Sequence, residues 1–210
     1  MGIDRFVVWQ VVETAGFEAA SIQLDGLALR ADGTVVGQLP EPYRLSYRLR
    51  TDDRAATAQL AVTCVTGSGE TRLNLRRDDT GWTVDGQPRP DLAAALDCDL
   101  ACSPMTNTMP VLRHRLHREP GTERFTMAFV EVPSLRVLPS AQAYTHLGPE
   151  PGGARVRYAS GTFRSDLLFD TDGLVIHYPT MAHRIDPVES VTAQERSSGA
   201  GSARPGSPPA

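Results

Sequence analysis

The chain has 210 residues, of which 40% are hydrophobic and 22% are charged, and its formal net charge at pH 7 is -4. This composition is typical of a globular domain and excludes a collagen-like or wholly disordered chain. The negative charge would repel a phosphate backbone, so the sequence argues against nucleic acid as a partner.

The C-terminal end differs in composition from the rest of the chain. Residues 191–210 are dominated by Gly, Ser and Pro, which is typical of a solvated, disordered tail. The remaining length is enough for one sizeable core and short for two. We therefore predict a single domain over residues 1–190 and a disordered tail over residues 191–210.

We expect neither an export signal nor a transmembrane segment. Residues 1–9 contain one Arg and only a short apolar stretch, whereas a signal peptide needs a longer one. No apolar run approaches the roughly 20 residues that span a bilayer. The three cysteines are an odd number, which argues against a disulfide framework. The expected location is the cytoplasm, with free thiols.

Alternation of apolar and polar residues is the dominant pattern of the chain. In residues 43–50 the side chains of Tyr43, Leu45, Tyr47 and Leu49 alternate with polar ones, which is typical of a half-buried strand. Similar patterns or short apolar runs predict strands at 21–30, 58–65, 71–76, 125–130, 155–158, 163–169 and 174–178. The chain is therefore predicted to be mainly β.

Turn signals separate these strands and suggest antiparallel neighbours. Asp-Gly and related sequences that tolerate positive φ occur at 31–33, 78–81, 85–86 and 171–173. A long meander must close or roll up, because open edges and an uncovered apolar face promote aggregation. We predict a twisted antiparallel β-roll or open barrel.

Helix signals are few, and one helix inside the roll is expected to help fill it. Residues 106–116 are the main candidate, with Thr106 or Asn107 as the N-cap and Pro110 in the first turn. Their apolar residues at helical spacing are Met109, Leu112 and Leu116. Residues 90–96 predict at most a turn or two of helix.

Two clusters suggest chemistry only weakly. Cys98, Cys102, His114 and His117 approach the spacing of a zinc site, but the His pair is too close and prolines interrupt the segment. Two buried thiols and two surface imidazoles are the favoured interpretation, and neither a metal nor another cofactor is expected. A second cluster, Arg113, Arg115 and Arg118 with both histidines, indicates a solvated helix face or an anionic head-group contact.

Enzymatic function stays an alternative. Asp97 and Asp99 are spaced so that both side chains lie on one face of a strand. They could act as general acid and base, or they could satisfy backbone donors near a turn. A Gly-x-Ser-x-Gly elbow and a phosphate-binding Gly loop are missing from the sequence. The aromatic residues Trp9, Tyr47, Trp82, Tyr144 and Tyr158 fit either a packed core or the wall of a cavity.

Several segments together resemble the glycolipid-binding family of bacterial proteins. They are the Trp strand at 81–86, the Asp-x-Asp-Leu segment at 97–100, the Pro-x-Thr-Asn-Thr-x-Pro stretch at 104–110, and residues 142–144 and 169–179. The resemblance extends from Trp9 to Arg184. Ser103, Met109 and Leu112 stand where the family usually has Thr, Leu and Arg, so Arg113 alone matches the family's pair of arginines.

The resemblance implies a spiral β-roll of many strands around one α-helix, similar in shape to lipoprotein carriers that hold acyl chains inside. It favours a non-enzymatic carrier or sensor that buries a lipid or glycolipid. A fully packed interaction module and an enzyme acting on a sugar or lipid conjugate are the alternatives. The predicted ligand-binding residues are Thr106, Asn107, Thr108, Arg113, Gln142 and Tyr144 at the polar end, with Tyr158 and Trp82. The alternative role of the polar-end residues is to cap the internal helix and to satisfy buried backbone groups.

Overall fold

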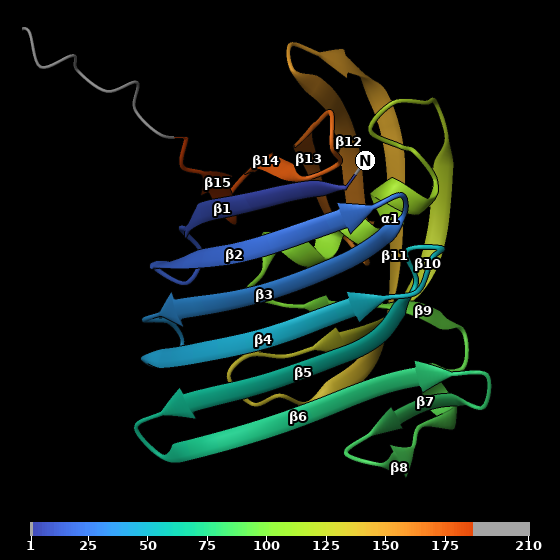
Figure 1. Ribbon diagram of the computed structural model, residues 1–210. Helices are drawn as coiled ribbons and strands as arrows, with labels where there is room; N and C mark the ends of the chain where they lie inside the picture. Colours follow the sequence, from blue (N-terminus) through green and yellow to red (C-terminus); the bar gives the residue numbers. More distant parts are fainter. Residues whose placement is uncertain (1, 187–210) are drawn as a thin grey trace, which may run out of the picture.

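The structure, a computed structural model, describes residues 2–186 (Figure 1). These residues form one sheet of 15 strands. The predicted tail at 191–210 lies outside the described residues. Within residues 2–186 no helix is both long enough and apolar enough to cross a membrane.

The sheet consists of two meanders that meet where β1 pairs with β15. The first contains β1 (Ile3–Val11), β2 (Gly16–Asp25), β3 (Ala28–Gly37), β4 (Tyr43–Thr51), β5 (Thr57–Thr66), β6 (Gly69–Asp78), β7 (Gly81–Val84) and β8 (Gln87–Pro88). The second contains β9 (Ala95–Leu100), β10 (Thr122–Val130), β11 (Val137–Glu150), β12 (Gly153–Ser160), β13 (Phe163–Asp170), β14 (Val175–Tyr178) and β15 (Ala182–Arg184).

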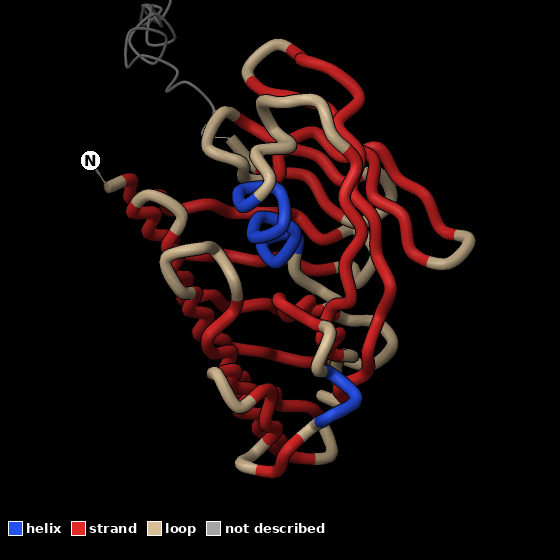
Figure 2. Tube along the Cα trace, turned by 90° about the vertical axis from the view of Figure 1, so that its right-hand side faces the viewer, coloured by secondary structure: helices blue, strands red, loops and turns tan. Residues whose placement is uncertain are grey.

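The prediction of a mainly β, unclosed roll is confirmed. The edge strands β8 and β9 do not pair with each other, and the sheet curls so that its two halves face one another (Figure 2). One feature of the topology differs from the prediction, because β9 and β10 run parallel. The connection between them carries the helix, and a crossover of that length permits a parallel pair.

The helix predicted at 106–116 is present but shorter. A 3-10 turn, η2 (Pro104–Asn107), leads into α1 (Thr108–Arg113), which lies between the two halves of the sheet (Figure 2). The predicted side-chain cap is wrong, because Asn107 itself has helical φ and ψ angles and makes no cap bond. Near residues 90–96 only η1 (Pro90–Leu92) is helical.

One predicted turn is wrong for an instructive reason. Residues 31–33 lie within β3, and the chain turns instead near Gly26, whose φ is +61°. Gly33 is needed inside the strand because a Cβ there would lie 2.3 Å from the Tyr47 ring. A glycine within a strand often marks such a close approach. The predicted turns at 78–81, 85–86 and 171–173 are confirmed.

Side chains from both halves of the sheet and from the helix fill the interior. Both tryptophans are core residues whose indole N–H groups donate to backbone carbonyls at 2.8 Å, Trp9 to Val175 and Trp82 to Ala95. The Trp82 bond joins β7 to β9, so it links the open ends of the two meanders. The roll is held together by packing and by such bonds, although it is not closed by strand pairing.

Candidate functional site

Most of the predicted binding residues gather around the helix. Thr106, Asn107, Thr108 and Arg113 lie on η2 and α1, while Gln142, Tyr144 and Tyr158 lie on β11 and β12. Trp82 is the exception, since it lies on β7 and bonds to β9. Apart from Arg113, these side chains are buried. The predicted residues on η2, α1, β11 and β12 therefore lie near one another, and most of them are internal.

A hydrogen-bonded pair connects the helix to β11. The hydroxyl of Tyr144 donates to the side-chain oxygen of Asn107 at 2.8 Å, and the Asn107 amide donates to the Pro104 carbonyl at 3.3 Å. The Tyr144 ring meets the Tyr158 ring edge-on, with centroids 5.3 Å apart. These contacts fix the Asn107 side chain in one orientation.

Asp99 is the carboxylate that two of the predicted residues hold in place. Gln142 donates its amide to one oxygen at 2.6 Å, and the Thr106 hydroxyl donates to the other at 3.1 Å. Burial raises the pKa of Asp99, although these hydrogen bonds oppose the rise. The Gln142 carbonyl and the Thr108 hydroxyl find no hydrogen-bond partner in the part of the chain that the structure describes.

Asp97 is sequestered from any ligand. Its side chain is fully buried and binds the Arg113 guanidinium through both oxygens. Arg113 also donates to the Ala55 carbonyl at 3.1 Å, and its guanidinium carbon lies 5.6 Å from the centroid of the Phe125 ring. Bidentate arginine–carboxylate pairs of this kind are rigid and strong. The pair fastens the end of α1 to β9.

The predicted basic cluster is divided in the structure. Arg113 is committed to Asp97, Arg115 pairs with Glu119 at 3.0 Å, and Arg118 donates to the Thr171 carbonyl at 2.7 Å. These three arginines therefore have separate partners and do not form one anion-binding surface.

The Cys and His side chains are separated in the same way. Cys98 and Cys102 are buried. His117 is only 6% exposed, so the prediction of a surface imidazole is wrong there, because the ring packs beneath the turn at Gly173. Among residues 2–186 no three His, Cys, Asp or Glu side chains are grouped as metal ligands.

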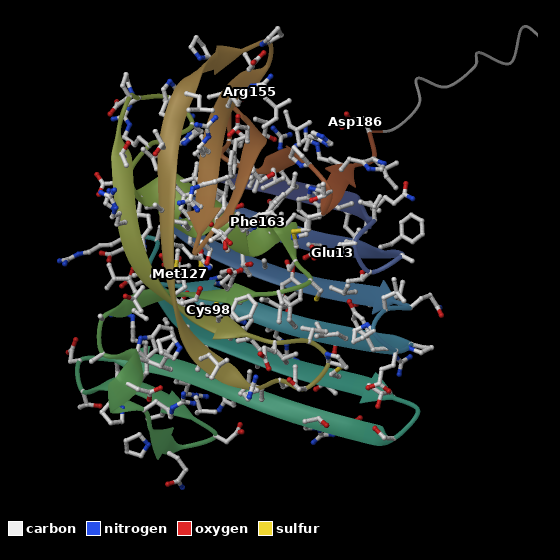
Figure 3. The ribbon with its side chains drawn as sticks, turned by 180° about the vertical axis from the view of Figure 1, so that it is seen from behind. Glu13, Cys98, Met127, Arg155, Phe163 and Asp186 are labelled. Carbon is white, nitrogen blue, oxygen red and sulfur yellow. The ribbon has the colours of Figure 1, made fainter. Side chains whose placement is uncertain are left out.

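A cleft of about 400 Å³ opens beside Asp99 and Asn107. Tyr158, Tyr178 and Phe163 line it as well. Glu13 on the β1–β2 turn and Phe163 at the start of β13 can be located in Figure 3. A hollow of about 530 Å³ lies over β3 to β6, but it contains none of the predicted residues. Another hollow, of about 520 Å³, has Arg113 in its lining, but this guanidinium is bound to Asp97. Two of the predicted residues, Asn107 and Tyr158, line the cleft, which is the candidate site.

Both aromatic rings and polar groups line the cleft. The Tyr158 ring lies edge-on to Phe163 with centroids 6.0 Å apart, and it is tilted against Tyr178 at the same distance. Burial raises the pKa of Tyr158 to about 12, so its hydroxyl stays protonated and can donate a hydrogen bond at neutral pH. Apolar faces beside a few oriented polar groups are the usual composition of a small-molecule site.

Comparison with known proteins identifies the family. Residues 6–184 match the family described as "Putative glycolipid-binding". The chain belongs to this family. It is also similar to the crystal structure of a DUF1089 family protein from Pseudomonas aeruginosa, with 28% identity and a TM-score of 0.67, over 80% of this chain and 92% of that one. None of the curated proteins matches the chain.

In this family member, the motif at 104–110 supports the cleft mainly from behind. Asn107 reaches the lining, whereas Thr106 binds Asp99 and Thr108 is fully buried. The motif therefore has a structural role. It also contributes the Asn107 amide to the cleft lining, and its Thr106 holds Asp99.

Sequence reasoning missed Glu13, Phe163 and Tyr178 as site residues. They belong to three separate segments that strand pairing brings to one cleft, so no local pattern could have marked them. A buried carboxylate, Glu18, was also missed. Its signal was visible, because Glu18 has the same parity as the inward Ala20 and Ile22 on β2.

Glu18 lies in the core beneath η2. One of its oxygens accepts hydrogen bonds from Tyr47 at 2.5 Å and from Ser103 at 2.6 Å. Burial raises its pKa to about 7, against the effect of these bonds. A carboxyl group with this pKa changes its charge near neutral pH.

Proposed function

We propose that this protein is a non-enzymatic carrier or sensor of a glycolipid, and that the sugar head group binds in the cleft beside Asp99. The observation that carries the proposal is the convergence of Asp99 and Asn107 with the rings of Tyr158, Tyr178 and Phe163. A pyranose presents hydroxyls at its rim and C–H groups on its faces. Oriented polar groups match the hydroxyls, and aromatic rings match the faces.

The residues behind the cleft act by positioning. Gln142 and Thr106 orient Asp99, and Tyr144 orients Asn107. These partners hold the polar groups in place before a ligand arrives, which reduces the ordering cost of binding. The sequence predicted the polar end of the site on the motif. We propose that Asn107 contacts the ligand directly and that its neighbours act indirectly, by positioning the contacting groups.

The first experiment is native mass spectrometry of freshly purified protein, followed by extraction and identification of any ligand. A co-purifying glycolipid supports the proposal and identifies its head group. If the protein carries no small molecule and takes up no hydrophobic dye, a packed interaction module becomes the better explanation.

A variant pair tests the cleft itself. Phe163 and Phe17 are each 46% exposed, but Phe163 lines the cleft and Phe17 lies on the outer face of β2. We expect Phe163→Ala to weaken binding of octyl glucoside, measured by calorimetry below its micelle-forming concentration, by about tenfold. Phe17→Ala is expected to leave it unchanged. If the two substitutions weaken binding equally, the cleft is not the binding site.

The enzyme alternative now depends on Asp99, since Asp97 is bound to Arg113 and lies away from the cleft lining. Asp99→Asn keeps the shape of the side chain and removes its charge. A carrier with this change binds the extracted ligand more weakly, and neither form consumes it. Ligand breakdown by the unchanged protein that stops in Asp99→Asn would instead identify an enzyme.

A further inference from the structure

A second, smaller groove adjoins the cleft. It has a volume of about 270 Å³ and shares two lining residues, Glu13 and Ala101, with the cleft. Its other walls are Thr14, Leu39, Pro40, Tyr43, Cys102 and Val132. The two spaces therefore have two wall residues in common.

Backbone hydrogen bonds hold the walls of this groove in place. Leu39 donates its N–H to the Thr14 carbonyl at 3.2 Å, which ties the β3–β4 loop to the β1–β2 turn. The N–H of Glu13 bonds to the Met181 carbonyl at 3.3 Å, and that of Ala101 bonds to the Val130 carbonyl at 3.0 Å. Three segments that are distant in sequence are thus fixed around one groove before any ligand binds.

Aliphatic side chains form much of the groove lining, and one carboxylate is shared with the cleft. Leu39, Pro40 and Val132 present aliphatic surface, and Leu39 is 53% exposed. Glu13 is the charged member of the groove lining, and it also lines the cleft.

We propose that one amphiphile occupies both spaces, with its head group in the cleft and a single acyl chain in the groove, crossing at Glu13 and Ala101. This inference rests on the proposed head-group site and extends it. It places the acyl chain in a groove at the rim of the sheet and not inside the roll. The roll interior is occupied by side chains such as Leu45, Leu60 and Met105, which are fully buried.

The test uses n-alkyl glucosides of increasing chain length with the full-length protein. Methyl glucoside serves as the head-group probe and octanol as the tail probe. From butyl to octyl glucoside we expect tighter binding at each added methylene, up to about fourfold per methylene when it is fully buried. Calorimetry or titration by NMR measures each dissociation constant.

A matched pair of variants localises the chain-length effect. Leu39→Asp places a charge in the groove wall, and Leu147→Asp makes the same change at a 40% exposed leucine on β11. We expect Leu39→Asp to abolish the gain with chain length and to leave methyl glucoside binding unchanged. Leu147→Asp should change neither. Because both leucines are exposed, thermal unfolding is expected to show folded protein in both cases.

The outcomes separate this inference from the proposed head-group site. Octanol binding that is lost in Leu39→Asp supports the groove even if methyl glucoside does not bind. Methyl glucoside binding without octanol binding overturns the groove and keeps the head-group site. A gain with chain length that survives Leu39→Asp, or that Leu147→Asp removes equally, also overturns it.

Discussion

The hydroxyl of Tyr144 donates a 2.8 Å hydrogen bond to the side-chain oxygen of Asn107, and both side chains are buried. Tyr144 belongs to β11, and Asn107 ends η2 just before α1. The bond therefore connects the internal helix to the second meander, and it orients an amide that lines the cleft. One contact serves both the fold and the candidate site.

We predict that Asn107→Ala lowers the free energy of unfolding by about 1–3 kcal/mol, because it leaves the buried Tyr144 hydroxyl unpaired. Urea unfolding of both proteins measures the difference. Tyr144→Phe removes the other end of the bond, so the double variant should cost less than the sum of the two single ones. Unchanged stability with weakened ligand binding would instead make Asn107 a binding residue without a structural role.

The Arg113–Asp97 ion pair gives a second prediction. Arg113→Met leaves a fully buried carboxylate without its partner, and we expect a loss of about 3–5 kcal/mol in the free energy of unfolding. The exposed pair of Arg157 and Asp166 is the control, since Arg157→Met should cost less than about 1 kcal/mol. Equal losses in urea unfolding would show that the buried carboxylate is not the cause.

Local pattern was enough to predict much of the fold. The alternation at 43–50 became β4, and Asp85-Gly86 became the turn between β7 and β8, with positive φ at both residues. These features depend on side-chain parity and on single-residue φ preferences, which sequence shows directly. The pairing of β1 with β15 is a long-range contact, and no local pattern indicates it.

The candidate site was predictable only in part for the same reason. Asn107 and Tyr158 were predicted as ligand-binding residues, and they line the cleft. Glu13 and Phe163 reach it only because the two meanders join through β1 and β15. Arg113 was predicted as a ligand contact from the resemblance, but its commitment to Asp97 depends on burial, which sequence did not reveal.

Gly33 provides a third prediction. A Cβ at this position would lie 2.3 Å from the Tyr47 ring, so Gly33→Ala must displace a fixed aromatic side chain. We expect a loss of about 1–3 kcal/mol, which is typical of overpacking. Gly67→Ala is the matched control, since its Cβ would meet nothing within 4 Å. Thermal unfolding compares the two, and equal melting temperatures would contradict the steric explanation.

The last prediction concerns Glu18 and pH. Its pKa in the folded protein is about 7, above the ordinary value of 4.5, because burial disfavours the charged form. The folded state therefore binds this proton more tightly than the unfolded state does. The resulting stability is fully present below pH 4.5 and is lost as the pH rises through 7. The total effect is about 3 kcal/mol, so Glu18 alone makes the protein less stable at about pH 8 than at about pH 5.

Glu18→Gln isolates this contribution, because the amide has the shape of the carboxyl group and does not titrate. In the unchanged protein, Glu18 raises the free energy of unfolding at about pH 5 relative to about pH 8 by about 3 kcal/mol. We expect this contribution to be absent in Glu18→Gln. Urea unfolding at each pH gives the comparison. If Glu18→Gln retains the full pH dependence, Glu18 is already charged in the folded protein, and its bonds from Tyr47 and Ser103 outweigh the cost of its burial.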